Sequence, residues 1–384
     1  MTEPARRIVF LGTHGQYNIG DELLLDTFLT QLGSQHHYVV NSYDPEFTRA
    51  QLAGRFDVEV IDTAGDRRRL LRELIRCDVL CFGGGSIVKE LYASTGRNRY
   101  STLLMILAIV TFTHRIARKP ITMLNVGVGP VRTPRGRRLA RMILSQVDEL
   151  TVRDEKSRAL CASIGITPVL ATDAVFSVDA GSLRGESETG CVTDGSDPVR
   201  VALNLNFDIE NPDNWELFLD RLATALVRVH ERRPIEVHAL PMQAGFKEHD
   251  DAEVLKEFST RVPSIRFVDH ELTSPADAAR LIDSCDVLVS ERLHAIVIAS
   301  ILGVPSFVLA YDVKVRELAS MLGLVPWSVD INEPFDADDV GDRILDLIEQ
   351  RESVAAEVHR HSAELGQKAR RNFESARQWV AAAR

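Results

Sequence analysis

Residues 285–305, CDVLVSERLHAIVIASILGVP, contain the transition that decides the fold. An apolar run with strand character (285–290) passes through Arg292 and His294 directly into an apolar helix (295–303). Open α/β sheets bind anions at such turns, because the N–H groups of the helix N-terminus point outward there. Arginine binds carboxylate or phosphate in bidentate fashion, and histidine transfers protons near neutral pH. We therefore expect both side chains to face a ligand; the alternative is a surface arginine and a core histidine.

Outward from this turn, both halves of the chain alternate short apolar, β-rich runs with helical stretches of ten or more residues. This alternation predicts parallel sheets flanked by helices, and hence an α/β protein with two Rossmann-like domains. The expected strands of the first half are RIVFLG, HYVVNSY, VEVIDT, DVLCFGGG, ITMLNVGVG, ELTVRD and PVLATDAVFSV, and those of the second half are VRVALNLN, PIEVHALP, IRFVDHE, CDVLVS and VPSFVLAYD.

The domain boundary is expected at residues 179–198, which are rich in Gly, Ser, Asp and Glu and have no apolar periodicity. The first domain then covers residues 1–178 and the second covers residues 199–384. A helical stretch from about 337 to 383 is longer than its own domain needs, so we expect it to pack back across the first domain.

The charge and the cysteine content indicate which kinds of binding partner and which cell compartment to expect. The net charge of −10 argues against a nucleic-acid binder, although RRRLLR (67–72) and RTPRGRRLAR (132–141) are locally basic. The second run is either a solvated loop and first helical turn or a contact for anionic lipid or a polyanionic substrate. Five scattered cysteines and an N-terminus without the long apolar region of a signal peptide favour the cytoplasm.

The longest apolar stretch is STLLMILAIVTFT (101–113). It is too short to span a bilayer, which needs about 20 residues, so we expect a buried helix. Its basic flanks leave open a second interpretation, in which it rests on the inner face of a membrane as a peripheral contact.

Two glycine-rich turns are candidate ligand loops. The first, GTHGQYNIGDELLL (12–25), follows a strand and opens a helix, and it is either a tight turn capped by Asp21 or a loop that approaches a ligand. It matches neither the dinucleotide fingerprint nor the P-loop. The second, CFGGGSIVKE (81–90), requires positive φ or close backbone contact, and we favour ligand contact through Gly84, Gly85 and Ser86.

Two further stretches carry chemistry. In TVRDEKS (151–157), Arg153 ends a strand and is either salt-bridged or ligand-binding, while Asp154 is expected to cap the next helix. In HALPMQAGFKEHDD (238–251), the cluster of His238, His249, Asp250 and Asp251 raises a metal alternative. That spacing fits no standard ligand pattern, so no metal is expected.

Five motifs in order resemble the polysaccharide pyruvyltransferase family: GxxGxxNxGDE, a strand ending in GGGS, TxRDxxS, SxRLHAxxxAxxxGVP and YDxKV, spread over residues 12–324. The resemblance implies two Rossmann-like domains in a GT-B-like arrangement. It also implies transfer of the enolpyruvyl unit of phosphoenolpyruvate to a sugar of a cell-surface polysaccharide or glycolipid, which forms a cyclic ketal and releases phosphate. Phosphoenolpyruvate is then a co-substrate, with no cofactor, and the saccharide acceptor is free or lipid-linked.

The resemblance also assigns residues. Arg292, Leu293 and His294 match the family's RLH, which contacts phosphoenolpyruvate, and Arg153 matches an arginine that faces the same anion. Lys314 is a further candidate for the donor. Asn18, Gly20 and Asp21 fall in the glycine loop and are expected on the acceptor side.

The expected mechanism uses His294 as the acid that protonates the methylene carbon and Asp21 as the base for the acceptor hydroxyl. His14 and Gln16 depart from the aromatic or small residues expected in the loop, which bears on the acceptor more than on the reaction class. Two alternatives stay open: a GT-B-type nucleotide-sugar glycosyltransferase, and a non-catalytic protein that binds a sugar or anion.

Overall fold

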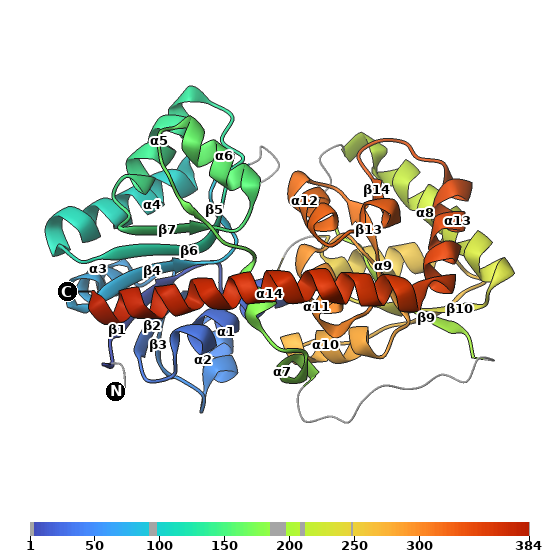
Figure 1. Ribbon diagram of the computed structural model, residues 1–384, viewed down its shortest axis with the longest axis horizontal. Helices are drawn as coiled ribbons and strands as arrows, with labels where there is room; N and C mark the ends of the chain where they lie inside the picture. The colour runs from blue at the N-terminus through green and yellow to red at the C-terminus, as the bar shows by residue number, and fades with distance from the viewer. Residues whose placement is uncertain (1–3, 92–97, 185–196, 208–211, 247–248, 384) are drawn as a thin grey trace. The chain divides into compact units, whose positions relative to one another are not determined.

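The computed structural model describes residues 4–91, 98–184, 197–207, 212–246 and 249–383. Its contacts divide the chain into two compact units (Figure 1). Unit 1 comprises Met1–Gln16, Asp21–Ser177 and Gln367–Arg384, and unit 2 comprises Tyr17–Gly20 and Val178–Gly366. One boundary between the units lies at Ser177–Val178, whereas residues 17–20 and 367–384 belong to the unit other than the one expected from their place in the sequence.

Unit 1 is built on a parallel sheet in the order β3-β2-β1-β4-β6-β7-β8, with β5 paired to β6. Its strands are β1 (Arg7–Leu11), β2 (His37–Ser42), β3 (Asp57–Asp62), β4 (Val79–Gly83), β5 (Ser86–Val88), β6 (Ile121–Val128), β7 (Glu149–Val152) and β8 (Val169–Leu170). The central strands β1, β4 and β6 are almost fully buried, as their continuous apolar runs require of strands covered on both faces.

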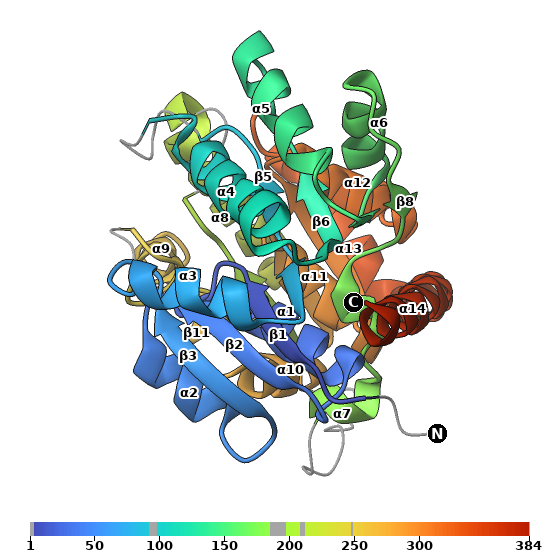
Figure 2. The same ribbon diagram turned by 90° about the vertical axis from the view of Figure 1, so that its left-hand side faces the viewer.

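Helices cover both faces of this sheet. They are α1 (Ile19–Leu32), α2 (Pro45–Leu52), α3 (Arg67–Arg76), α4 (Ser101–Thr111), the π-helix η2 (Phe112–Ala117), α5 (Pro134–Leu144), α6 (Glu155–Ser163) and the 3-10 helix η3 (Ala174–Ser177). One continuous core joins β1, β4 and β6 to apolar side chains of α3, α4 and α5. Figure 2 shows α3, α4 and α5 on one side of the sheet and α2 on the other.

The opposite face of the sheet is closed partly by the end of the chain. Phe10 of β1 packs against Phe28 of α1, with ring centroids 5.4 Å apart, and Phe28 packs edge-on against Phe373 of helix α14 (Arg351–Ala382) at the same separation. Asn372 donates a hydrogen bond to Asn125 of β6 (2.8 Å). These contacts explain why residues 367–384 belong to unit 1 rather than to the second domain assigned to 199–384.

Unit 2 has a parallel sheet in the order β11-β10-β9-β12-β13-β14. The strands are β9 (Val199–Asn204), β10 (Ile235–Ala239), β11 (Arg266–Val268), β12 (Val287–Ser290), β13 (Ser306–Ala310) and β14 (Ser328–Asp330). Its helices are α7 (Ala180–Arg184), η4 (Pro212–Asn214), α8 (Trp215–Arg232), α9 (Asp251–Ser259), α10 (Pro275–Asp283), α11 (Leu293–Leu302), α12 (Val313–Met321), η5 (Val325–Trp327), α13 (Ala337–Glu349) and the first part of α14.

Two expectations about local structure need correction or limits, and a third is confirmed. The proposed linker begins with the ordered helix α7, whose Arg184 pairs with Asp283 of α10 at 3.0 Å, while residues 185–196 lie outside the described residues. Asp21 does not cap α1; it lies within the first turn, and Asn18 accepts a hydrogen bond from the Gly20 N–H (3.0 Å) at the helix start. Asp154 does cap α6, through the Ser157 N–H (2.7 Å).

Helix α4 is the apolar helix expected at 101–113, but it is only partly buried. Leu103, Ile106 and Val110 enter the core, whereas Leu104 and Met105 are exposed. A helix that is apolar all round is normally buried, so its outer face is unusual. No helix in the described part of the chain is both long and apolar enough to cross a membrane.

Candidate active site

Each sheet has one point at which its strand order reverses. In unit 1 it lies between β1 and β4, and in unit 2 between β9 and β12. Open α/β sheets bind ligands outside the carboxyl ends of the strands at this point. The glycine loop follows β1, Gly84–Ser86 follow β4, and Arg292 follows β12. The three motifs chosen from sequence therefore lie at the switch points of their sheets.

The RLH turn joins β12 to α11 within unit 2. Arg292 occupies the N-cap position of α11 with an extended backbone (φ −76°, ψ 122°), and its N–H donates to Asn204 Oδ1 (3.1 Å) at the end of β9. Leu293 and His294 form the first turn of the helix. From Ala295 onward α11 is entirely buried, so the apolar helix fixes the turn rigidly at the edge of the sheet.

The Arg292 guanidinium is held by a buried carboxylate. Its Nε and Nη2 donate to Asp251 Oδ2 (3.1 Å) and Oδ1 (2.5 Å), and Nη2 also donates to Gln243 Oε1 (3.2 Å). Sequence reasoning expected bidentate capture of the donor by Arg292. That edge of the guanidinium is engaged by Asp251, so bidentate capture through it requires Asp251 to be displaced.

Asp251 organises this cluster. Its side chain is 1% exposed, and besides Arg292 it accepts hydrogen bonds from Asn204 Nδ2 (3.0 Å) and the Met242 N–H (3.1 Å). It thus joins the ends of β9 and β10 to the RLH turn. An unpaired buried charge is costly, so the carboxylate and the guanidinium hold each other in place.

Residues Tyr17–Gly20 also belong to unit 2. The Ile19 N–H donates to the Met242 carbonyl (2.9 Å), and Asn18 forms an isolated antiparallel bridge with Gln243. A Cβ built on Gly20 would lie 2.2 Å from Nδ1 of His294, so no larger residue fits without a shift. The structure thus brings Asn18 and Gly20, expected on the acceptor side, into the same unit as Arg292 and His294.

Lys314 lies on the neighbouring strand-helix connection, in the first turn of α12. Its Nζ pairs with Asp312 Oδ2 (2.9 Å), and Asp312 caps the same helix through the Val315 N–H (3.0 Å). The side chain is 38% exposed. The ion pair of Lys314 is therefore local, and its role toward the donor stays a prediction.

In unit 1, the glycine loop is held by a carboxylate that the sequence analysis did not select. Gly15 has φ +71°, and its N–H donates to Glu22 Oε1 (2.7 Å). Glu22 is 2% exposed, and burial raises the pKa of its carboxyl group to about 7. Hydrogen bonds from the backbone of Gly15 and Gln16 act in the opposite direction but do not cancel the effect of burial. The predicted base Asp21, one residue earlier, is half-buried in the first turn of α1.

His14 of the same loop is buried against β1. Its ring stacks on Phe10 with centroids 5.9 Å apart, and neither ring nitrogen has a hydrogen-bond partner among the described residues. Burial lowers the pKa of His14 to about 3, so the imidazole is neutral at physiological pH. This histidine packs as an aromatic ring in the position where the family resemblance led us to expect an aromatic or small residue.

The GGGS turn and Arg153 form a second cluster in unit 1. Gly84 and Gly85 have φ +68° and +64°, the left-handed conformation expected of this turn. Arg153 is 7% exposed; its Nη2 donates to Ser86 Oγ (3.2 Å), and its Nη1 lies 3.4 Å from Asp173 Oδ2. Arg153 is therefore salt-bridged as well as placed at the end of β7, and it belongs to a different unit from Arg292.

The residues of the metal alternative do not converge. His238 contacts His270 (2.9 Å), Asp250 caps α9, and Asp251 binds Arg292. Among the described residues, no group of three or more His, Cys, Asp or Glu side chains could hold a metal ion.

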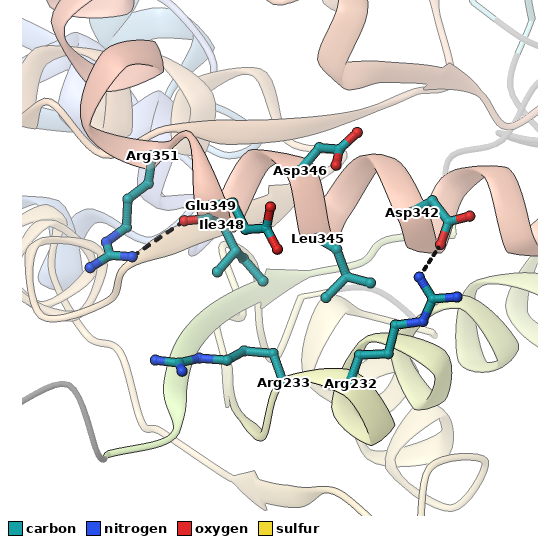
Figure 3. A pocket seen from close by; sticks show the side chains of 8 residues that line it. All are labelled: Arg232, Arg233, Asp342, Leu345, Asp346, Ile348, Glu349 and Arg351. Atoms are coloured by element: carbon teal, nitrogen blue, oxygen red, sulfur yellow. Dashed lines mark hydrogen bonds and ion pairs between the residues drawn. The ribbon is translucent and has the colours of Figure 1, made fainter.

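A pocket of about 640 Å³ in unit 2 is lined by none of the motif residues described above (Figure 3). It is formed by the end of α8, by α13 and by the start of α14, and charged groups of both signs line it, including Arg232, which pairs with Asp342 at 3.0 Å. The end of α8 leads into the amino end of β10, at the sheet edge opposite the RLH turn. Its lining residues are Arg232, Arg233, Asp342, Leu345, Asp346, Ile348, Glu349 and Arg351.

The family model for polysaccharide pyruvyl transferase matches residues 18–313. The chain belongs to the polysaccharide pyruvyl transferase family. The matched region contains Asn18, Gly20, Arg153 and the RLH turn, and it ends one residue before Lys314. Family membership confirms the resemblance and supports a polysaccharide-modifying transferase.

A curated protein is also similar to this chain in sequence. The amylovoran biosynthesis protein AmsJ of Erwinia amylovora is 22% identical over 272 residues, which cover 66% of this chain and 64% of AmsJ. The chain thus matches just under two thirds of the length of that protein.

Solved structures show that the chain has a GT-B-like fold. A glycosyltransferase from Rickettsia africae superposes with a TM-score of 0.63 at 11% identity, covering 99% of this chain and 100% of that one. The UDP-GlcNAc 2-epimerase of Neisseria meningitidis, solved with UDP-GlcNAc, gives 0.61 at 11% identity, covering 96% and 99%. The predicted fold class is confirmed.

Proposed function

We propose that this protein transfers the pyruvyl group of phosphoenolpyruvate to a sugar of a cell-surface polysaccharide or glycolipid, forming a cyclic ketal and releasing phosphate. The observation that supports this most directly is the RLH turn at the switch point of unit 2, where Asp251 fixes Arg292 and Gly20 packs against His294. We place the reaction in the cytoplasm, because Cys77, Cys81, Cys161 and Cys285 are free thiols, as is usual in a reducing compartment.

Electrostatics favours a donor with two anionic groups at this turn. The N-terminus of α11 carries partial positive charge, and Arg292 adds a full charge at the N-cap. Because Asp251 already neutralises part of that charge, the carboxylate and phosphate of the donor require a second cation. Arg153 and Lys314 are the candidates, as the family resemblance implies.

The proposed reaction keeps atoms and charges in balance. His294 donates a proton to the methylene carbon of phosphoenolpyruvate, which becomes the methyl group and leaves C2 electrophilic. One acceptor hydroxyl attacks C2 and gives its proton to Asp21. Phosphate then leaves, which makes C2 electrophilic again, and a second hydroxyl of the same sugar attacks C2 and closes the ketal, giving its proton to the departing phosphate. Phosphoenolpyruvate is the co-substrate, and before the next turnover Asp21 releases its proton to solvent and His294 takes one up.

The donor is tested by thermal unfolding with phosphoenolpyruvate and with a panel of nucleotide sugars. A ligand at about 100 times its Kd stabilises the folded state by about 2.7 kcal/mol. Arg292→Lys is the informative variant, because it keeps the charge that Asp251 needs but loses the planar fork. Arg184→Lys is a matched control, since Arg184 makes the same two-pronged contact to Asp283 (3.0 Å for both bonds) outside the site.

We expect phosphoenolpyruvate to shift the midpoint of the wild type and of Arg184→Lys, and to shift Arg292→Lys less. A shift with nucleotide sugars alone would assign the chain to the glycosyltransferase alternative. Binding without phosphate release, in the presence of acceptor sugars, would instead indicate a non-catalytic binding protein. His294→Gln should retain donor binding and lose about 10²-fold or more in turnover.

A further inference from the structure

The outer face of α3, α4, η2 and α5 in unit 1 is positively charged, whereas the chain as a whole carries a negative net charge. These four elements contain ten Arg against one acidic residue, Glu73, in a protein whose net charge is −10. Glu73 pairs with Arg7 (2.6 Å), and Arg69 pairs with Glu59 of β3 (3.0 Å). Most of the positive charge of this face is therefore not offset by acidic side chains of the same elements.

The same face is also apolar. Helix α4 has no charged residue, and after Leu103, Ile106 and Val110 fill the core, Leu104 and Met105 remain 44% and 49% exposed. Exposed apolar side chains of the neighbouring elements join them. Those of the whole face, called here the basic apolar face, are Leu71, Ile75, Leu104, Met105, Ile116 and Met142.

These elements are neighbours in the fold. Helix α4 packs against α5, and η2 continues α4 and packs against α3; Figure 2 shows the three α-helices on one side of the sheet. On α3, Leu71 and Ile75 lie one turn apart, beside the exposed Arg68, Arg72 and Arg76, which repeat at the same interval. Apolar and cationic side chains therefore alternate across one continuous surface.

We propose that the basic apolar face binds the surface of a membrane containing anionic lipid. Helices at a bilayer interface bury an apolar face near the acyl boundary and place Lys and Arg at the headgroups. Leu104, Met105 and Ile116 are the side chains that enter the interface, and the arginines of α3 and α5 contact phosphate. The proposal does not depend on the reaction, but it would hold the enzyme where lipid-linked acceptors are found.

Two other occupants fit the face less well. A symmetric dimer through this surface would place arginine against arginine, since the same patch meets itself across a twofold axis. Single-stranded nucleic acid is bound by aromatic stacking between cations, whereas the exposed side chains here are aliphatic.

The test is flotation of the full-length protein with vesicles of phosphatidylcholine alone and of an equal mixture with phosphatidylglycerol. The wild type should float only with the anionic vesicles, and less so at high salt. The variant R68Q/R72Q/R76Q should bind about 10²-fold more weakly, because each arginine near an anionic surface contributes about fivefold. The control R266Q/R280Q/R360Q removes the same charge from exposed sites of unit 2 and should bind like the wild type.

Insertion of the apolar residues is tested separately with Leu104→Trp. The added indole fluorescence of this variant should shift to the blue with anionic vesicles and stay unchanged with phosphatidylcholine. Failure of the wild type to float, equal loss in both triple variants, or an unshifted emission from the Leu104→Trp variant would overturn the proposal. Binding of RNA at salt concentrations that abolish flotation would assign the face to nucleic acid instead.

Discussion

Replacing Glu22 by Gln should change how the stability of unit 1 depends on pH. The carboxyl group has a pKa of about 7 in the folded protein, against an ordinary value of 4.5, because burial disfavours its charge. The folded state therefore keeps this proton between about pH 4.5 and pH 7, where the unfolded chain has released it. Stability from this group is complete below about pH 4.5 and is lost as the pH rises to about 7.

The size of the effect follows from the same values. The difference in pKa corresponds to about 3 kcal/mol of unfolding free energy lost across this window. Glutamine cannot ionise, and its amide oxygen can still accept the Gly15 N–H. Its amide N–H2 would be buried where Glu22 Oε2 has no partner among the described residues, at a cost of about 1–3 kcal/mol at every pH. The variant should be the less stable protein near pH 5 and should regain about 3 kcal/mol relative to the wild type by about pH 8.

Urea unfolding at about pH 5 and about pH 8 measures this difference. Trp379 reports on unit 1 once Trp215 and Trp327, both in unit 2, are replaced by Phe in all proteins compared. His14 also titrates anomalously, but it is present in both proteins, so its contribution cancels in the difference. Glu155→Gln, at an exposed position of α6, is the control and should show no pH-dependent difference. An equal free-energy difference at both pH values would refute the assignment of a buried, protonated Glu22.

Two further predictions concern unit 2. Gly20→Ala should lower turnover about 10²-fold, because the new Cβ would lie 2.2 Å from Nδ1 of His294 and displace the imidazole ring. Steady-state kinetics measures this loss. Unchanged turnover would exclude the packing of this glycine against the histidine. Asp251→Asn should cost about 3–5 kcal/mol of unfolding free energy and weaken donor binding, because it leaves the Arg292 guanidinium without its buried counter-charge. The more exposed Asp283→Asn should cost about 1 kcal/mol or less, and equal losses in the two variants would contradict the argument.

Much of the fold was predictable because it depends on local patterns. Continuous apolar runs such as ITMLNVGV and VLVS are long enough to specify buried parallel strands, and the helices between them show apolar periodicity. Helices α2 and α12 were not predicted; they have eight and nine residues, and fewer than half of those are buried, which leaves little periodicity to detect. The exposure of α4 could not be predicted, because an apolar sequence does not reveal what covers it.

In the candidate site too, the sequence predicted the features formed by neighbouring residues and missed the contacts between distant ones. The RLH turn was located because strand, turn and helix are adjacent in sequence. The partner of Arg292 was not, because Asp251 lies 41 residues earlier and meets it only through the pairing of β9 with β10 and β12. Likewise, the sequence could not decide between Asp21 and Glu22, because only the packing of α1 determines which of two successive carboxylates turns inward.

Helix α14 makes the two units unequal during protein synthesis. Unit 1 contains the first residues of the chain, yet Phe10 and Phe28 complete their ring packing only with Phe373, and Arg6 donates to the Ala381 carbonyl (2.6 Å), 375 residues away. The ribosome must therefore release residues 367–382 before unit 1 can complete its core. All of unit 2, including its own part of α14, is synthesised before those residues. The first unit to be translated is the last that can finish folding, and its apolar sheet face depends on protection from aggregation in the interval.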